Sequence, residues 1–435
     1  MNILLMSCGS LSFILLAAHF LRSGDIPLAF AILASIVLIF LKRRWSRYIS
    51  AIILTAGIPV WIITSAGLIQ QRIAADLSWI RLTFIMSLVI VFSILISYLF
   101  FKSVKDIKER DTDWWAGAAV LLTLVILISG RWKAPYEMII FDRFIPESGM
   151  AEIVFLGIYA GFITELFLTL KNTSKLRVLI WAGFSVIFFL QFILGISGID
   201  QFLMTGNLHI PVPAVIVGGP VFRGHGFFMV ILFLVTIAAA GPAWCSYFCY
   251  FGAWDNVAAK KVDRAEKCGS IPSGNILIRI LMLAIIVLTA YLFRVFSVSQ
   301  ITAAAAAICF GLIGFIIMRV SSAKRGVMIH CTSYCPIGLI AVIAGKISPF
   351  RIGIEKTCSS CMACSKVCRY GALSHNNISS HKPGLTCTLC GDCVNVCHNN
   401  SIQYRFYGLS PKTARALFTV IVVSIHAAFL GFARI

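Results

Sequence analysis

The sequence predicts an all-α polytopic membrane protein with a small α+β segment inserted before its last helix. Of the 435 residues, 59% are hydrophobic and only 12% are charged, whereas about 25% of the residues of a soluble globular protein are charged. Apolar runs of membrane-spanning length recur along the chain. The one extended polar stretch, residues 351–411, holds eight of the 15 cysteines. These observations indicate that lipid surrounds most of the chain and that its chemistry is concentrated in one polar segment.

The apolar runs predict about eleven transmembrane helices. Each is close to the roughly 17–25 residues that a spanning helix needs, except the second, which is slightly short. The first lacks a basic n-region and a small-residue cleavage site, so we expect a retained helix rather than a cleaved signal. The runs are residues 3–21, 26–41, 49–70, 80–101, 114–130, 151–170, 177–199, 226–243, 274–296, 299–318 and 415–433.

The positive charge of the chain predicts its topology. The formal net charge is +20, and the basic residues lie mostly in short loops between apolar runs, which indicates membrane topology and not nucleic-acid binding. Alternate loops contain eighteen and eight Lys or Arg residues. Because cytoplasmic loops carry the excess, the N-terminus and residues 351–411 are predicted to be cytoplasmic, in the inner (cytoplasmic) membrane.

Four segments follow from this pattern. Residues 1–150 are N-terminal transmembrane helices to which the sequence assigns no role, and residues 151–350 form a membrane core. Residues 351–411 form the polar segment, and residues 412–435 the last transmembrane helix. The polar segment has few apolar residues for a core, so its fold is expected to depend on what its cysteines bind.

Two identical cysteine runs predict two 4Fe–4S clusters. Both have the spacing C-x2-C-x2-C-x3-C, in which three thiolates wrap one face of a cluster and the fourth ligates the neighbouring cluster. One cluster is therefore predicted on Cys358, Cys361, Cys364 and Cys397. The other is predicted on Cys387, Cys390, Cys393 and Cys368.

The competing interpretations of these runs are structural zinc and disulfides. Zinc sites use cysteine pairs separated by a longer loop, and disulfides are out of place in a reducing compartment. Residues 355–405 resemble a bacterial two-cluster ferredoxin. The resemblance departs from the family at Arg369 and His398, because proline usually follows each fourth cysteine.

Two further cysteine pairs lie upstream, each with the spacing C-x3-C. Both follow a membrane helix on the predicted cytoplasmic side, and their common pattern suggests an internal repeat. Cysteines at i and i+4 share one helix face. Three interpretations stay open: a further metal or iron–sulfur centre, a redox-active dithiol, or structural packing. The pairs are Cys245 with Cys249, and Cys331 with Cys335.

The order of these motifs over residues 150–410 resembles the membrane-bound polyferredoxins of the NapH/NosR type. Tyr250 stands where the family usually has proline. The resemblance implies that electrons pass between the membrane quinone pool and a partner redox protein, either another redox subunit or a soluble carrier. The chain would then be an electron-transfer subunit of an oxidoreductase, and the direction of flow is not specified.

A Pro- and Gly-rich apolar segment, residues 200–226, predicts a non-helical re-entrant stretch. Such backbone is tolerated at membrane depth where it is buried or lines a cavity, so this is a candidate quinone site. Ordinary hydrogen bonding is the alternative for its polar side chains. The candidate residues are Asp200, His209, Arg223 and His225.

The rest of the sequence narrows the chemistry. Cys8, Cys268 and Cys309 have no partner spacing and are interpreted as structural. Neither a dinucleotide-binding fingerprint nor a P-loop is apparent, so nicotinamide and ATP chemistry are not expected. Two rival functions stay open: a redox-sensing or metallocentre-assembly factor that reduces a metal or disulfide, and a transporter with a ferredoxin tail.

Overall fold

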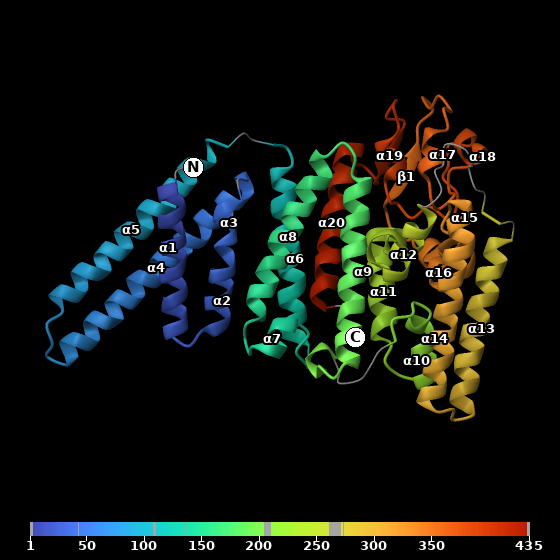
Figure 1. Ribbon diagram of the computed structural model, residues 1–435. Coiled ribbons are helices and arrows are strands. Elements are labelled where there is room, and N and C mark those ends of the chain that lie inside the picture. Colours follow the sequence, from blue (N-terminus) through green and yellow to red (C-terminus); the bar gives the residue numbers. More distant parts are fainter. Residues whose placement is uncertain are drawn as a thin grey trace. The chain divides into compact units, whose positions relative to one another are not determined.

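The computed structural model describes residues 3–41, 43–107, 110–134, 136–203, 210–260, 271–272 and 274–432. The chain divides into two compact units, Met1–Glu165 and Leu166–Ile435. Both consist mainly of helices (Figure 1).

Ten of the described helices are long and apolar enough to cross a membrane. The multi-pass prediction is therefore supported, with one difference. The second predicted helix is shorter than a span, because it consists of α2 and α3, interrupted at Ile36. In the first unit the helices are α1 (Ile3–Arg22), α2 (Ile26–Ser35), α3 (Val37–Phe40), α4 (Arg44–Ala74), α5 (Ile80–Val104), α6 (Asp113–Lys133), α7 (Ile140–Phe144) and α8 (Gly149–Thr169), which extends into the second unit.

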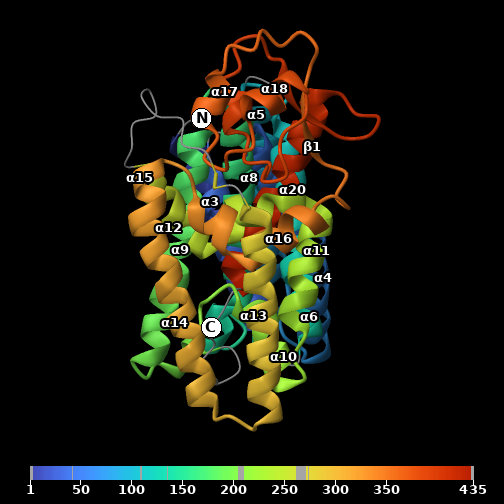
Figure 2. The same cartoon turned by 90° about the vertical axis from the view of Figure 1, so that its right-hand side faces the viewer.

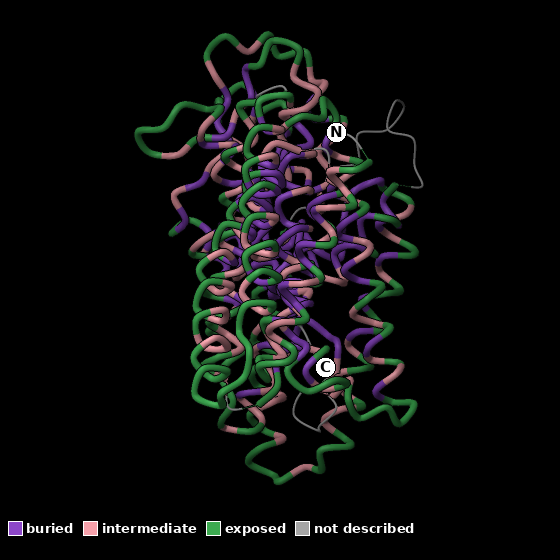
Figure 3. Tube along the Cα trace, turned by 90° about the vertical axis from the view of Figure 1, so that its left-hand side faces the viewer, coloured by how far each residue is buried: buried purple, intermediate pink, exposed green. Residues whose placement is uncertain are grey.

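The long helices expose apolar side chains in the way that lipid contact requires. On α5, Phe84 is 73% exposed and Leu88 is 64% exposed. Figure 3 shows mainly exposed and half-buried residues along the helices nearest the viewer. Helices satisfy their own backbone hydrogen bonds, so such faces are stable in hydrocarbon.

A buried carboxylate organises part of the first unit. Glu165 accepts hydrogen bonds from Trp45 Nε1 at 3.2 Å and from Arg110 Nη1 at 2.8 Å, and Arg43 Nη1 lies 2.8 Å from the same carboxylate. A buried charge is tolerated when it is paired and hydrogen-bonded. This network is a structural anchor between α4, α6 and α8.

The second unit combines long helices with short ones. The long ones are α9 (Ser174–Ile196), α11 (Phe228–Ala240), α13 (Asn275–Val295), α14 (Gln300–Ile317) and α20 (Pro411–Phe432). The short helical elements are η1 (Asp200–Phe202), α10 (Val215–Arg223), η2 (Gly241–Ala243), η3 (Trp244–Phe248), α12 (Tyr250–Ala259), η4 (Met318–Ser322), α15 (Ala323–Arg325), η5 (His330–Tyr334) and α16 (Pro336–Ala344).

The prediction that residues 200–226 are non-helical was wrong over Val215–Arg223, which form α10. Pro220 lies inside this helix and is buried, as is Ile216. The apolar face of α10 has tertiary contacts that outweigh the low intrinsic helix propensity of Gly and Pro. Gly224, in the left-handed region with φ 75°, ends the helix.

Residues 351–405 form a small α+β structure at one end of the helices of the second unit (Figure 1, Figure 2). The strands β1 (Arg351–Ile354) and β2 (Ile402–Arg405) pair antiparallel, with Ile352 opposite Tyr404. The Tyr404 ring lies 4.8 Å from that of Phe418 on α20, which packs the sheet on this helix. Between the strands are α17 (Ala363–Val367), α18 (His375–Ser379) and α19 (Asp392–Asn395).

Candidate metal centres

The two C-x3-C pairs have the same local structure, a single π-helical turn. In η3 the Cys249 N–H donates to the Trp244 carbonyl oxygen at 2.9 Å, and in η5 the Cys335 N–H donates to that of His330 at 2.8 Å. Short π turns are rare and occur often at functional sites. The prediction that each pair shares one α-helix face was wrong, because the second cysteine leaves the turn with an extended backbone.

A new helix begins directly after that second cysteine. Cys249 precedes α12 and Cys335 precedes α16, so the first N–H groups of these helices have no intrahelical partner. The N–H groups of Phe251 and Gly252 point at Cys249 and lower the pKa of its thiol, although burial dominates and raises that pKa to about 12. In the second motif, Ile337 and Gly338 do the same for Cys335, whose pKa burial also raises.

A glycine in each motif permits this close packing. A Cβ atom on Gly252 would lie 2.8 Å from the Cys245 carbonyl oxygen, and one on Gly338 would lie 2.8 Å from that of Cys331. Both distances are shorter than carbon and oxygen tolerate. The two motifs therefore share their turn, their helix start and their glycine.

The structure brings both pairs into one buried group, which we call the boundary set: Cys245, Cys249, Cys331 and Cys335. The pKa of Cys331 is raised by burial and further by the charges of Asp255 and of the other three cysteines. Mutual influence of this kind requires that the four sulfur atoms lie near one another. Sequence spacing left open whether the pairs meet, and tertiary contacts answer that question.

Two charged residues that sequence analysis missed adjoin the boundary set. Asp255 on α12 accepts a 3.0 Å hydrogen bond from the Cys331 N–H, and burial raises the pKa of its carboxyl to about 6. Arg279 on α13 is 1% exposed and interacts electrostatically with Cys245, Cys331 and Cys335. The sequence did contain an indication of their role, because an ionisable residue inside an apolar helix often belongs to a functional site.

The eight cysteines of residues 351–411 line two cavities. We call the cysteines of the first the outer set and those of the second the inner set. The first cavity, of about 260 Å³, is lined by Cys358, Cys361, Cys364 and Cys397. The second, of about 20 Å³, is lined by Cys368, Cys387, Cys390 and Cys393. Each cavity thus contains three cysteines of one run and the fourth cysteine of the other.

The two runs also repeat their backbone conformation. Ser360 and Leu389, each directly before the second cysteine of its run, have φ of 50° and 55°. Met362 and Gly391, each directly after that cysteine, have φ of 61° and 79° and precede α17 and α19. Left-handed residues on both sides of a cysteine turn N–H groups inward, the type of concavity that holds anions and iron–sulfur clusters.

A preformed site for a single metal ion would bring three or more ligand side chains close together around one point. Within the described residues, no group of three or more His, Cys, Asp or Glu side chains forms such a site. The cysteines of the inner and outer sets surround cavities instead. The outer cavity, of about 260 Å³, leaves room for a cluster of several iron atoms, whereas the four ligands of a single zinc ion stand about 2.3 Å from it.

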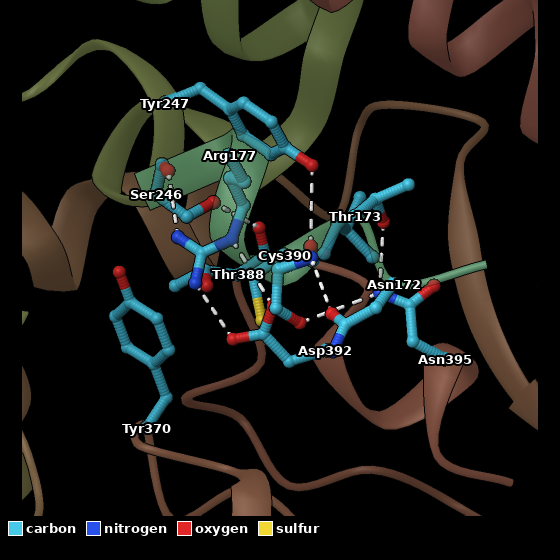
Figure 4. A network of polar contacts seen from close by, with 12 residues as sticks. Asn172, Thr173, Arg177, Ser246, Tyr247, Tyr370, Thr388, Cys390, Asp392 and Asn395 are labelled. Atoms are coloured by element: carbon cyan, nitrogen blue, oxygen red, sulfur yellow. Dashed lines mark hydrogen bonds and ion pairs between the residues drawn. The ribbon is translucent and has the colours of Figure 1, made fainter. Parts of the chain in front are cut away.

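The first π turn bonds to the part of the chain that carries the inner set, and Figure 4 shows Ser246 and Tyr247 of this turn beside Thr388 and Cys390. Tyr370 Oη donates to the Cys245 carbonyl oxygen at 2.8 Å, and Tyr247 Oη donates to that of Cys390 at 3.2 Å. Ser246 Oγ donates to the Thr388 carbonyl oxygen at 3.0 Å. We call residues 368–393, which contain the inner set, the inner-set segment. Each residue of the first π turn from Cys245 to Tyr247 forms a hydrogen bond with this segment.

The described residues among those predicted to bind quinone lie outside both cavities. Asp200, Arg223 and His225 are exposed and line neither cavity described above, and His209 lies outside the described residues. Of the cysteines interpreted as structural, Cys8 is half-buried and Cys309 is exposed. Cys268 lies outside the described residues.

Comparison with known proteins adds one finding. The model of the 4Fe–4S binding domain family matches residues 222–267 and 308–355. The two matched stretches contain the two C-x3-C motifs and thus the whole boundary set. No curated protein and no solved structure matches the chain. The family match and the cysteine-rich region together support a ferredoxin-type iron–sulfur protein with many apolar helices.

Proposed function

We propose that this protein passes electrons between membrane quinone and a partner redox protein through three 4Fe–4S clusters, held by the boundary, inner and outer sets. The observation that carries the proposal is the direct bonding of the first π turn to the inner-set segment, through Tyr370 to Cys245 and Tyr247 to Cys390. It supports the order boundary, inner, outer. A cluster supplies one-electron redox chemistry when it is bound.

The residues of all three sets fit such a group. Each set offers four thiols, the ligands that 4Fe–4S clusters take. The boundary set is buried throughout, so its surroundings exclude water, and helix-start N–H groups point at Cys249 and Cys335. In the outer set Cys361 is exposed. An exposed ligand puts the outer set within reach of a soluble partner, and a buried set suits exchange inside the membrane.

The membrane and partner assignments rest on the motif order. Quinone is the expected redox partner of the boundary set because that set adjoins membrane helices, and a cytoplasmic redox protein is the expected partner of the outer set. The positive loops support an inner membrane with residues 351–411 on the cytoplasmic side. Lipid contacts the remaining surface of the helices.

Iron analysis tests the number of clusters. The protein purified without oxygen is expected to contain about twelve irons and as many acid-labile sulfides, four for each set. Cys331→Ser is expected to lose about a third of them, and the matched control Cys309→Ser none. Zinc in place of iron would overturn the proposal, and about eight irons, unchanged in Cys331→Ser, would overturn the third cluster.

Electron exchange in proteoliposomes tests the proposed function without assuming a direction of electron flow. A quinol, or a quinone after chemical reduction of the clusters, is expected to exchange electrons with all three sets, seen by the visible absorption of the clusters. Cys331→Ser is expected to prevent this exchange. Reduction of copper or of a disulfide without any response to quinone would instead favour the metallocentre-assembly function.

A further inference from the structure

Arg279 is a buried cation with no carboxylate partner in the described part of the chain. Its side chain is 1% exposed, and neither Nε nor Nη2 has a hydrogen-bond partner among the residues that the structure describes. Arg177, another buried arginine of this unit, forms an ion pair with Asp392 at 2.7 Å. A guanidinium is always charged, and burying a charge without compensation is costly. Arg279 therefore requires negative charge nearby.

The boundary set can supply that charge. Arg279 lies near the buried cysteines Cys245, Cys331 and Cys335, and its Nη1 is 3.8 Å from the point where a Cβ on Gly338 would stand. Gly338 is the glycine whose N–H points at Cys335. The guanidinium thus extends from α13 to the start of α16, where Cys335 of the boundary set lies.

Among the described residues, an acidic side chain also faces this set. Asp255 lies against Cys331 and already accepts its N–H. Asp255 is fully buried beside this set, and a carboxylate there adds negative charge to the surroundings. Asp255 therefore does not replace the boundary set as the countercharge of Arg279, and it increases the need for a cation there.

We propose that Arg279 is the countercharge of the boundary set and a positioning residue that raises the reduction potential of the cluster held there. This inference rests on the proposed function. Reduction adds one electron to the cluster and breaks no bond at Arg279. Because a nearby positive charge stabilises the more negative, reduced state, removing it disfavours reduction, and net charge and hydrogen bonds to sulfur are established determinants of cluster potential.

Redox titration of the full-length protein with dithionite, followed by EPR, tests the inference. The signal of the boundary set is the one that disappears in Cys331→Ser. Arg279→Met removes the charge and keeps the length of the side chain, whereas Arg279→Lys keeps the charge. Arg294→Met is the matched control, because Arg294 lies on the same helix fifteen residues further on, about 22 Å along its axis.

The expected result is specific to one signal. Arg279→Met is expected to reduce the one-electron equilibrium constant for reduction of the boundary set at least tenfold. This corresponds to a midpoint potential lower by about 59 mV. Arg279→Lys and Arg294→Met leave it within a third of that change, and the other two signals do not move. An unchanged potential in Arg279→Met, with its iron retained, would overturn the inference.

Loss of iron is also informative. If Arg279→Met loses the boundary iron while Arg279→Lys keeps both the iron and the potential, positive charge is what the set requires, and the inference stands. If Arg279→Lys loses the iron or shifts the potential as far as Arg279→Met does, the shape of the guanidinium matters and the inference fails. A missing boundary signal in the unaltered protein would overturn the proposed function instead.

Discussion

Arg177 on α9 and Asp392 on α19 form a buried ion pair, with Nη2 of the arginine 2.7 Å from Oδ2 of the carboxylate. Nη1 of the same guanidinium donates to the Ser246 carbonyl oxygen at 3.2 Å (Figure 4). One side chain thus joins a membrane helix, the first π turn and the inner-set segment. The pair holds the polar segment against the helices at the point where the inner and boundary sets meet.

Breaking this pair is expected to loosen the polar segment. Arg177→Met leaves the Asp392 carboxylate buried and unpaired, which costs about 3–5 kcal/mol. Limited proteolysis of residues 351–411 and thermal unfolding would measure the loss. The exposed pair between Arg405 and Glu355 is the control, and Arg405→Met is expected to cost at most about 1 kcal/mol. Equal effects of the two substitutions would contradict the anchoring role.

The motif glycines are expected to be essential for the boundary set. Gly252→Ala and Gly338→Ala each place a Cβ 2.8 Å from a carbonyl oxygen of the π turn, so the turn must move and the cysteines with it. We expect each variant to lose about a third of its iron. Gly183→Ala on α9, where a Cβ has nothing within 4 Å, is expected to lose none. Full iron content in Gly338→Ala would refute this role.

Removing the Tyr370 hydroxyl is expected to weaken the contact between the inner-set segment and the first π turn more than it weakens cluster binding. Tyr370→Phe leaves the buried Cys245 carbonyl oxygen without this donor, at a cost of about 1–3 kcal/mol. We expect a lower thermal midpoint and slower quinol-driven reduction of the inner set, with iron retained. Stopped-flow absorption would give the rate. A rate equal to that of the unaltered protein would show that this bond is not part of the route.

Cluster removal is expected to unfold one part of the chain selectively. Residues 351–411 have a two-stranded sheet and short helices, too little structure to be stable without their metal. Chelation under oxidising conditions should expose this segment to protease, while far-ultraviolet circular dichroism retains most of the helical signal of the membrane spans. A protease-resistant segment after complete iron loss would contradict the dependence on metal.

Much of the fold was predictable because its causes are local. A long apolar run must form a helix in lipid, and ten described helices meet that requirement. The errors arose where tertiary contacts decide. The second run ends as the short helices α2 and α3, and Val215–Arg223 is helical in spite of Pro220.

The cysteine spacing by itself determined the two predicted sets of four, because in each run the chain can wrap a cluster only with its first three thiolates. The fourth cysteine of each run was assigned to the cluster of the other run. The structure places the cysteines around the two cavities in these same two sets. Their ligation of iron stays a prediction. Spacing carries this information because neighbouring residues fix one another's positions.

Only the tertiary structure decided that the two C-x3-C pairs form one group and which charges face it. Cys249 and Cys331 are far apart in the sequence, and Asp255 and Arg279 carry no motif at all. Their meeting depends on how α12, α13 and α16 pack together, and packing is a property of whole helix faces. The chain therefore encodes its cysteine runs locally, and the environment of the boundary set only through its fold.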